Sequence, residues 1–196
     1  MRGMKIKMRT KNWHDISYLA SGTDRQKKAF DTLTRHRILD HLSSCSPVLV
    51  STVCVDLDIE GSDLDIICRH ENLSDFKRLV NGRFGNYPSF KQWMRSPASE
   101  EIVTSFYADD FEIEIFSSTV PVEEQFAYRH LTLMERTLKI GGGTLRQKVK
   151  ALKRSGLKTE PAFAKILGLS GDPYLAFLCF EKLNDDQLNE LIRGRI

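Results

Sequence analysis

Two aspartates separated by one residue are the feature of this sequence with the clearest chemical meaning. Asp63 and Asp65 lie in the run Ser62-Asp63-Leu64-Asp65, inside a β-prone segment that extends to Cys68. On a strand, residues two apart point to the same face and lie about 7 Å apart along the chain. Two buried carboxylates repel each other unless a cation neutralises them. Hard oxygen ligands at this spacing suit Mg²⁺ or Mn²⁺.

A later segment supplies further carboxylates. Residues 111–116 read Phe-Glu-Ile-Glu-Ile-Phe, so a strand here would place Glu112 and Glu114 on one face and its isoleucines on the other. Solvent exposure on an edge strand and a metal site both explain such a face. Glu114, or Glu112 in its place, is our candidate for a third metal ligand. Two divalent ions held in this way can clamp the attacking and leaving oxygens of a phosphoryl centre.

Four segments rich in β-branched and aromatic residues have the length and composition of strands. They are residues 48–54, 63–68, 101–107 and 111–116. Gly61 marks a turn, which indicates that the first two segments form a hairpin or a bulged, bent pair. A long amphipathic helix is expected from Thr23, as its N-cap, to about Leu42, and Ser74 is expected to cap another.

From Pro121 onward the pattern is helical, with a flexible break at residues 141–143. The layout predicts an α+β (or α/β) fold, in which helices flank a mixed β-sheet and the C-terminal part is helical. We expect residues 1–120 to form an α/β core and residues 121–196 to form a helical region packed on that core.

The composition excludes several classes of protein. Of the 196 residues, 41% are hydrophobic, which is enough for a packed core without disulfides. The four cysteines show no CxxC pairing, which argues against structural zinc. No apolar run reaches the roughly 20 residues of a membrane helix, and none follows the basic N-terminus as in a signal peptide. We expect a soluble, cytoplasmic protein with no membrane partner.

The positive charge is concentrated in one segment. Residues 136–158, here called the basic arm, contain eight Lys or Arg and no Asp or Glu. A basic arm beside an acidic pocket suits an enzyme that acts on a phosphate-bearing substrate, although a solvated helix face gives the same count. Helical spacing separates an apolar stripe of the arm from a basic stripe. The basic stripe is expected to contain Arg146, Lys150, Lys153 and Arg154.

These motifs resemble those of the DNA polymerase β-like nucleotidyltransferase superfamily. Its members carry a small-residue Gly-Ser turn, then a Ser-Asp-x-Asp strand, then an acidic residue on a later strand. Ser51-Thr52 occupies the turn here, Ser62-Asp63-Leu64-Asp65 matches the second element, and Glu114 matches the third. Together with residues 157–164 and 171–174, the segment from Thr52 to Cys68 is also similar to a bacterial family of nucleotidyltransferase-like proteins of unassigned function.

The resemblance implies a metal-dependent nucleotidyltransferase that moves a nucleoside monophosphate from a nucleoside triphosphate to a hydroxyl acceptor. Asp63, Asp65 and Glu114 would hold Mg²⁺ or Mn²⁺. Ser51 and Thr52 would anchor the triphosphate, with Ser62 beside them. The acceptor is left open among a small molecule, an RNA end and a protein side chain, and the oligomeric state is also open.

Two residues outside the motif are further candidates for binding the nucleotide. His130 follows the third-carboxylate strand on the next helix, where a structural role explains it equally well. Lys158 precedes a helix that starts near Thr159. Ser51 stands where the superfamily has Gly. That departure leaves an alternative open: a catalytically inactive nucleotide- or RNA-binding module of the same fold.

Overall fold

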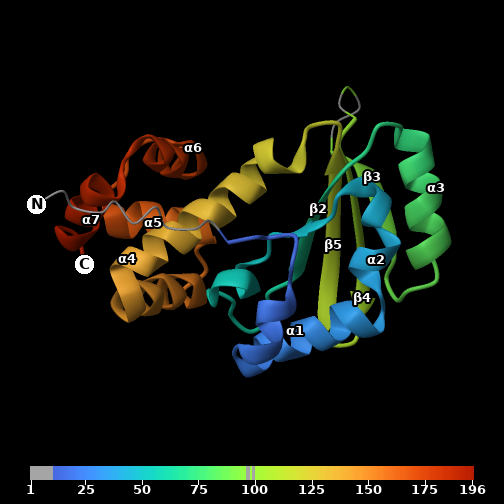
Figure 1. Ribbon diagram of the computed structural model, residues 1–196, viewed down its shortest axis with the longest axis horizontal. Coiled ribbons are helices and arrows are strands. Elements are labelled where there is room, and N and C mark those ends of the chain that lie inside the picture. The colour runs from blue at the N-terminus through green and yellow to red at the C-terminus, as the bar shows by residue number, and fades with distance from the viewer. Residues whose placement is uncertain (1–10, 96–97, 99) are drawn as a thin grey trace, which may run out of the picture.

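The computed structural model describes residues 11–95, 98 and 100–196 and is organised around a mixed sheet of five strands (Figure 1). The strands are β1 Val48–Leu49, β2 Leu64–Arg69, β3 Lys91–Met94, β4 Ile102–Ala108 and β5 Phe111–Ser118. Their order across the sheet is β1-β2-β5-β4-β3. β2 and β5 run parallel, and every other neighbouring pair is antiparallel. The predicted α+β fold with a mixed sheet and a helical C-terminal part is confirmed.

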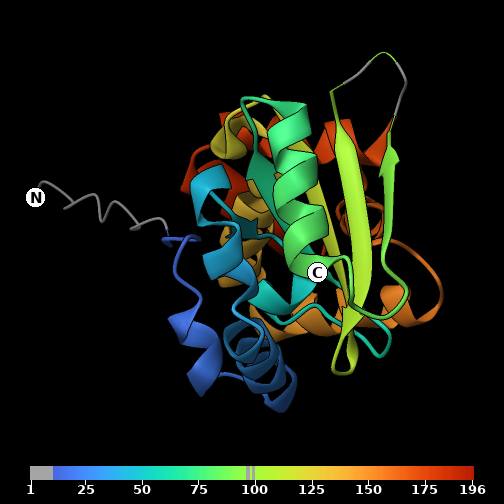
Figure 2. The same cartoon turned by 90° about the vertical axis from the view of Figure 1, so that its right-hand side faces the viewer.

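Helices lie on both sides of this sheet (Figures 1 and 2). α2 (Ile38–His41) and α3 (Leu73–Phe84) lie on one side, and α1 (Asp24–Arg35) runs across the end of the strands. The C-terminal helices gather on the other side: α4 Phe126–Arg154, α5 Thr159–Leu167, α6 Pro173–Leu178 and α7 Asp185–Arg193. Short 3₁₀ helices occur at Ser17–Ser21, Ser43–Cys45, Thr52–Val55 (η3), Val122–Glu124 and Cys179–Lys182.

The strand register gives the sheet two chemically different faces. The face toward α3 is apolar, and Ile66, Phe106 and Ile113 on it are at most 1% exposed. Phe106 stacks on Phe84 of α3, with ring centroids 4.9 Å apart. Strand residues alternate between faces, so the opposite face receives the acidic side chains of β2 and β5. The hydrophobic core on one face therefore fixes the carboxylates on the other.

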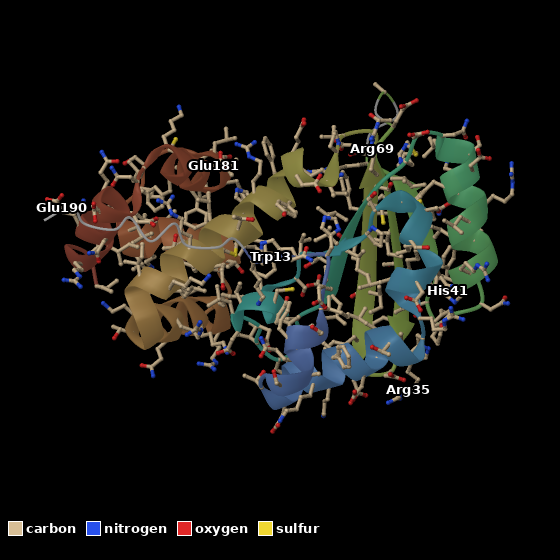
Figure 3. All side chains as sticks on the ribbon, viewed as in Figure 1. Trp13, Arg35, His41, Arg69, Glu181 and Glu190 are labelled. Carbon is tan, nitrogen blue, oxygen red and sulfur yellow. The ribbon has the colours of Figure 1, made fainter. Side chains whose placement is uncertain are left out.

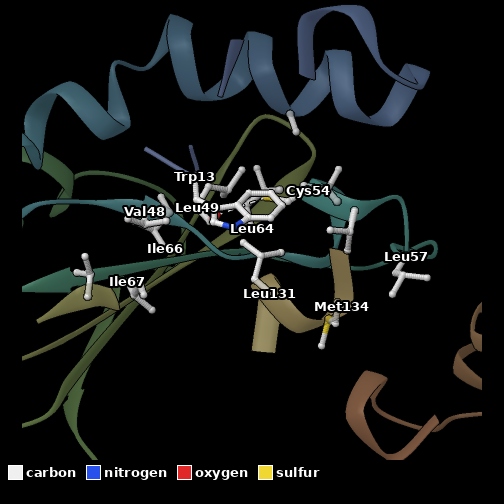
Figure 4. Close-up of a cluster of buried hydrophobic side chains, with 14 of the residues drawn as sticks. Trp13, Val48, Leu49, Cys54, Leu57, Leu64, Ile66, Ile67, Leu131 and Met134 are labelled. Carbon is white, nitrogen blue, oxygen red and sulfur yellow. Dashed lines mark hydrogen bonds between the residues drawn. The ribbon is translucent and has the colours of Figure 1, made fainter. Parts of the chain in front are cut away.

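A second part of the core joins the sheet to α4. Figure 4 shows Trp13 among Val48, Leu64 and the α4 residues Leu131 and Met134. Trp13 is 2% exposed and lies between the C-terminal helices and the sheet (Figure 3). The helical region shares buried surface with the sheet in this way, while its division from the core at residues 120 and 121 stays a prediction.

Several predicted element boundaries are wrong. The strand expected over residues 48–54 ends at Leu49, because the chain turns into η3 instead. The helix expected to reach Leu42 is broken at Arg37, whose φ of 52° is left-handed. The helix after β2 is capped by Asn72, whose side chain accepts from the Asp75 amide, and not by Ser74. β3 was not predicted, since its four residues are short and half polar.

The flexible break predicted at residues 141–143 is a kink inside α4. Gly142 has φ 59° and ψ −152°, a backbone conformation that is essentially restricted to glycine. The helix continues on both sides of it, from Phe126 to Arg154. α4 therefore consists of two helical segments that meet at Gly142.

No helix in the described ranges has both the length and the apolar character needed to cross a membrane.

Replacing Phe106 by Ala is expected to lower the free energy of unfolding by about 3–5 kcal/mol, because it removes a fully buried ring that stacks on Phe84. Phe126→Ala is the matched control, since that ring is 56% exposed, and a change within about 0.5 kcal/mol is expected for it. Urea denaturation of both variants measures the difference. Equal destabilisation would contradict this account of the core.

Candidate active site

The parallel pairing of β2 with β5 brings the predicted carboxylates together. Asp65 is the register partner of Glu114, so both side chains leave the same face of adjacent strands, which lie about 4.8 Å apart. Glu112 lies two residues earlier on β5, is exposed, and accepts a long hydrogen bond of 3.5 Å from the Tyr107 hydroxyl. Of the two glutamates left open by the sequence, Glu114 is the one beside Asp65.

The carboxylates interact strongly with one another. Burial, followed by the negative charges of Asp63 and Glu114, raises the pKa of Asp65 to about 7. The pKa of Glu114 is also raised, by burial first and then by Asp63 and Glu112. In both cases the positive charge of Lys158 opposes the shift. The three acidic side chains and Lys158 therefore belong to one electrostatic cluster.

The predicted triphosphate-binding turn begins at Ser51. Ser51 is 1% exposed, and its hydroxyl donates to the backbone carbonyl of Asp63 at 2.6 Å. Its φ of −60° is ordinary, so the serine side chain imposes no backbone strain where the superfamily has Gly. The hydroxyl fastens the turn to the carboxylate strand and is already engaged. Only the backbone of Ser51 is left to contact a phosphate.

A buried lysine reaches the next residue of the turn. Lys153, from the end of α4, is 8% exposed, and its Nζ donates to Thr52 Oγ1 at 3.2 Å and to the Leu57 carbonyl at 2.7 Å. Burial lowers the pKa of Lys153 to about 8, and the carboxylates of Asp58, Glu160, Asp63 and Asp65 oppose that shift. Lys153 was predicted to lie on a basic stripe that binds phosphate or faces solvent, but its side chain is buried.

Ser62 closes the loop that precedes the aspartates. Its hydroxyl accepts from the Ile59 amide at 3.0 Å, and its carbonyl accepts from the Arg25 guanidinium at 2.6 Å. Gly61 beside it has φ 78°, which a glycine adopts without strain. Arg25 also pairs with the buried Asp58, with Nε 3.3 Å from Oδ2. These contacts give Ser62 a positioning role at the start of β2.

His130 and Lys158 have different environments. His130 is 5% exposed, and its Nε2 lies 3.0 Å from the Tyr174 carbonyl while its Nδ1 lies 3.3 Å from a Glu160 oxygen. Both ring nitrogens therefore have neighbours within the protein. Lys158 is exposed at the N-cap of α5, near the carboxylates. Of these two candidates, Lys158 is the one with a side chain free to reach a ligand.

The donor set suits a hard divalent cation but is not pre-assembled. Asp63, Asp65 and Glu114 offer oxygens only, as Mg²⁺ and Mn²⁺ prefer. Burial first, and then the charges of Asp63 and Glu114, raise the pKa of Asp65, and a bound cation would offset the repulsion among these carboxylates. In the described ranges, no three His, Cys, Asp or Glu side chains converge closely enough to hold an ion. Rotation of these side chains toward one point would be part of binding.

Sequence reasoning missed Lys153 and Glu160. A signal for the first was present, because Leu145, Val149 and Lys153 are spaced four residues apart and all three are buried on one helix face. Glu160 had no comparable signal. Its pairing with His130 depends on how α5 packs against α4, which no local pattern encodes.

The fold defined by this sheet and its helices is that of nucleotidyltransferases, as comparison with solved structures shows. A structure of the GLD-2/RNP-8 complex matches 91% of this chain and 80% of its own, at 12% identity and a TM-score of 0.51. The Cid1 RNA terminal uridylyl transferase matches 81% of this chain and 49% of its own, at 14% identity and a TM-score of 0.50. The polymerase core of TRAMP, an RNA surveillance complex, matches at 13% identity and a TM-score of 0.47.

This chain belongs to the family described as Domain of unknown function (DUF4269), whose model matches residues 31–180. No curated protein matches the sequence. The chain spans 59% of the TRAMP polymerase core and 49% of the uridylyl transferase. The likeness to the GLD-2/RNP-8 complex and to the Cid1 transferase supports the fold alone.

Asp65→Asn is expected to change how stability depends on pH. The pKa of Asp65 is about 7 in the folded protein and near 3.8 without burial, so only the folded state holds this proton between those values. The wild type should therefore lose stability as pH rises from about 4 to about 7, by at most about 4 kcal/mol from this group. The variant should lose less, since of the two carboxyl groups with a raised pKa it keeps only Glu114. Urea denaturation in EDTA across that range tests this.

Asp109→Asn is the control with the opposite sign. Hydrogen bonds from His36 and Thr32 lower the pKa of Asp109, so its contribution to stability is present at neutral pH and is lost as pH falls through the lowered pKa. That variant should have a lower free energy of unfolding than the wild type at pH 7, and the difference should disappear in acid. As pH rises, the difference in stability between variant and wild type should change in opposite directions for Asp65→Asn and Asp109→Asn. A change in the same direction for both would contradict the account of Asp65.

Proposed function

We propose that this protein is a metal-dependent nucleotidyltransferase, which transfers a nucleoside monophosphate from a nucleoside triphosphate to a hydroxyl acceptor. The observation that carries the proposal is the pairing of Asp65 with Glu114 on adjacent parallel strands, with Asp63 close enough to raise the pKa of both. A cluster of like charges at the open face of a sheet is costly for folding. A charged substrate bound with a cation would explain its presence.

Asp63, Asp65 and Glu114 would hold Mg²⁺ or Mn²⁺, which when bound would offset negative charge at the reacting phosphate. The Ser51-Thr52 turn would present its backbone to the triphosphate, and Lys153 would keep that turn in place through Thr52 Oγ1. Lys158 lies on the same side as the carboxylates and is exposed. Its ammonium group would bind phosphate oxygens of the nucleotide.

Glu114 would also act on the acceptor. Its raised pKa makes it a better proton acceptor than an ordinary glutamate. As the acceptor oxygen forms its bond to the α-phosphorus, Glu114 would take the hydroxyl proton. The bond between the α-phosphorus and the bridging oxygen breaks, and pyrophosphate carries away that electron pair.

Asp65→Asn and Glu114→Gln are each expected to lower the rate of label transfer from an α-labelled nucleoside triphosphate by at least about 100-fold, since each removes a charge from the reacting centre. Transfer to the candidate acceptors is measured in Mg²⁺. Glu112→Gln is the matched control, because it makes the same change two residues away on the same face, and it should stay within a few-fold of the wild type. Equal transfer by all four proteins would refute the mechanism.

Lys158→Ala is expected to raise the KM for the nucleoside triphosphate about tenfold with a smaller effect on kcat, because a lysine–phosphate contact present in both substrate and transition state is lost. Lys148→Ala removes an exposed lysine of the basic arm on α4. It should leave the KM unchanged. A matching increase for both variants would mean that only the general charge of the arm matters.

The alternative function is a nucleotide- or RNA-binding module without catalysis. The engaged hydroxyl of Ser51 favours it. A nucleotide that binds only the native state raises the melting temperature. Such stabilisation without Mg²⁺, with no transfer to any acceptor, is the outcome that separates this module from the enzyme.

A further inference from the structure

The carboxylate face of the sheet also carries exposed aromatic side chains. Trp93 on β3 is 43% exposed and Tyr107 on β4 is 44% exposed. The proposed reaction and the packing of the core use neither. Large aromatic groups left open on a strand are costly to expose and are typical of ligand-binding surfaces.

The register fixes where these aromatics lie relative to the carboxylates. Trp93 pairs with Val103 and Val103 with Phe116, so Trp93 and the half-buried Phe116 stand in one row across β3, β4 and β5. The next row, two residues along each strand, contains Lys91, Ser105, Glu114 and Asp65. Rows on the same face lie about 7 Å apart. The aromatic row is therefore directly beside the proposed reacting centre.

Two cations accompany the aromatic row. The Arg95 guanidinium carbon lies 5.8 Å from the centre of the Phe116 ring, and Arg95 also pairs with Glu101 at 3.8 Å. Its positive charge is close enough to Glu114 to oppose part of the rise in the pKa of that carboxyl group, which burial chiefly causes. Lys91 is exposed and shares a row with Glu114. We call Lys91, Trp93, Arg95, Tyr107 and Phe116 the sheet-face platform.

We infer that the sheet-face platform binds the end of a single-stranded nucleic acid, which is the hydroxyl acceptor of the reaction proposed above; the assignment of acceptor rests on that proposal. Open aromatic rings next to cations are the features by which proteins hold single strands, through base stacking and phosphate contacts. The terminal base would stack on Trp93. Lys91 and Arg95 would contact phosphates, and the terminal hydroxyl would then lie toward Glu114.

The charge pattern favours a polyanion with planar bases over the other acceptors. β3 is one of the two edge strands of the sheet (Figures 1 and 2). A nucleic-acid strand longer than one nucleotide would leave the site past this edge. Lys91 and Arg95 lie on the β3 side of Glu114. The phosphate backbone of an acceptor strand would run along this side. A protein side chain would need neither the exposed rings nor the cations.

The two tryptophans make the inference directly measurable. Trp13 is 2% exposed and Trp93 is 43% exposed, so quenching by a stacked base reports chiefly on Trp93. An unlabelled 15-nucleotide single strand is titrated into the intact protein in EDTA without nucleoside triphosphate, at low salt. Saturable quenching is expected. A dye-labelled copy of the strand gives the dissociation constant by anisotropy.

Trp93→Ala is expected to weaken binding about tenfold or more, and Trp93→Phe to restore most of it, because stacking needs a ring. Lys91→Ala should reduce the slope of log affinity against log salt by about 0.7. Phe126→Ala removes a ring that is 56% exposed on α4, outside the sheet, and this variant should bind like the wild type. Circular dichroism confirms that each variant is folded.

Asp63→Asn combined with Asp65→Asn separates this inference from the proposed function. If that variant binds the strand as the wild type does and Trp93→Ala does not, the platform is supported even where no transfer occurs. Absence of quenching at low salt, or equal binding by Trp93→Ala and the wild type, overturns the inference. Transfer to a small hydroxyl compound by a protein that binds no strand would overturn it too, while leaving the proposed function standing.

Discussion

Electrostatic repulsion between carboxylates on neighbouring strands is the constraint on which this structure depends. Parallel pairing of β2 with β5 places Asp65 beside Glu114. Burial, together with the charges of Asp63 and Glu114, raises the pKa of Asp65 to about 7. The apolar face of the same sheet makes this arrangement possible, because burial of Ile66 and Ile113 sets the register that brings the acids together. Packing on one face therefore sets the positions of the carboxylates on the other.

The loop before the carboxylate strand is held from three directions. Ser51 ties it to the backbone at Asp63, Gln26 of α1 donates to the Val53 carbonyl at 2.8 Å, and Lys153 of α4 binds Thr52 and Leu57. Each contact comes from a different part of the chain. A loop fixed in this way needs little reorganisation to receive a ligand, which lowers the entropic cost of binding.

The sequence was sufficient for features that depend on short-range pattern. Asp63 and Asp65 are two residues apart, which predicted that they share one face of a strand, and the alternation in residues 111–116 predicted the same for Glu112 and Glu114. Sequence alone did not choose between the glutamates, because that choice depends on register between strands nearly fifty residues apart. Lys153 was predicted to belong to the basic stripe because of its charge, although its four-residue spacing from Val149 matches the buried face of the helix. β3 was not predicted, because four residues are too few to show a periodic pattern.

The bend at Gly142 has a mechanical consequence. The first half of α4 is anchored in the core through Leu131 and Met134, whereas the second half carries Lys150 and Lys153 to the loop around Asp56 and Leu57. The backbone angles of Gly142 thus set the direction of the second half of the helix. Any side chain at this position would oppose these angles and swing the lysines away from the acids. The distance between the lysines of α4 and the acidic residues of the loop therefore depends on Gly142, which carries no charge itself.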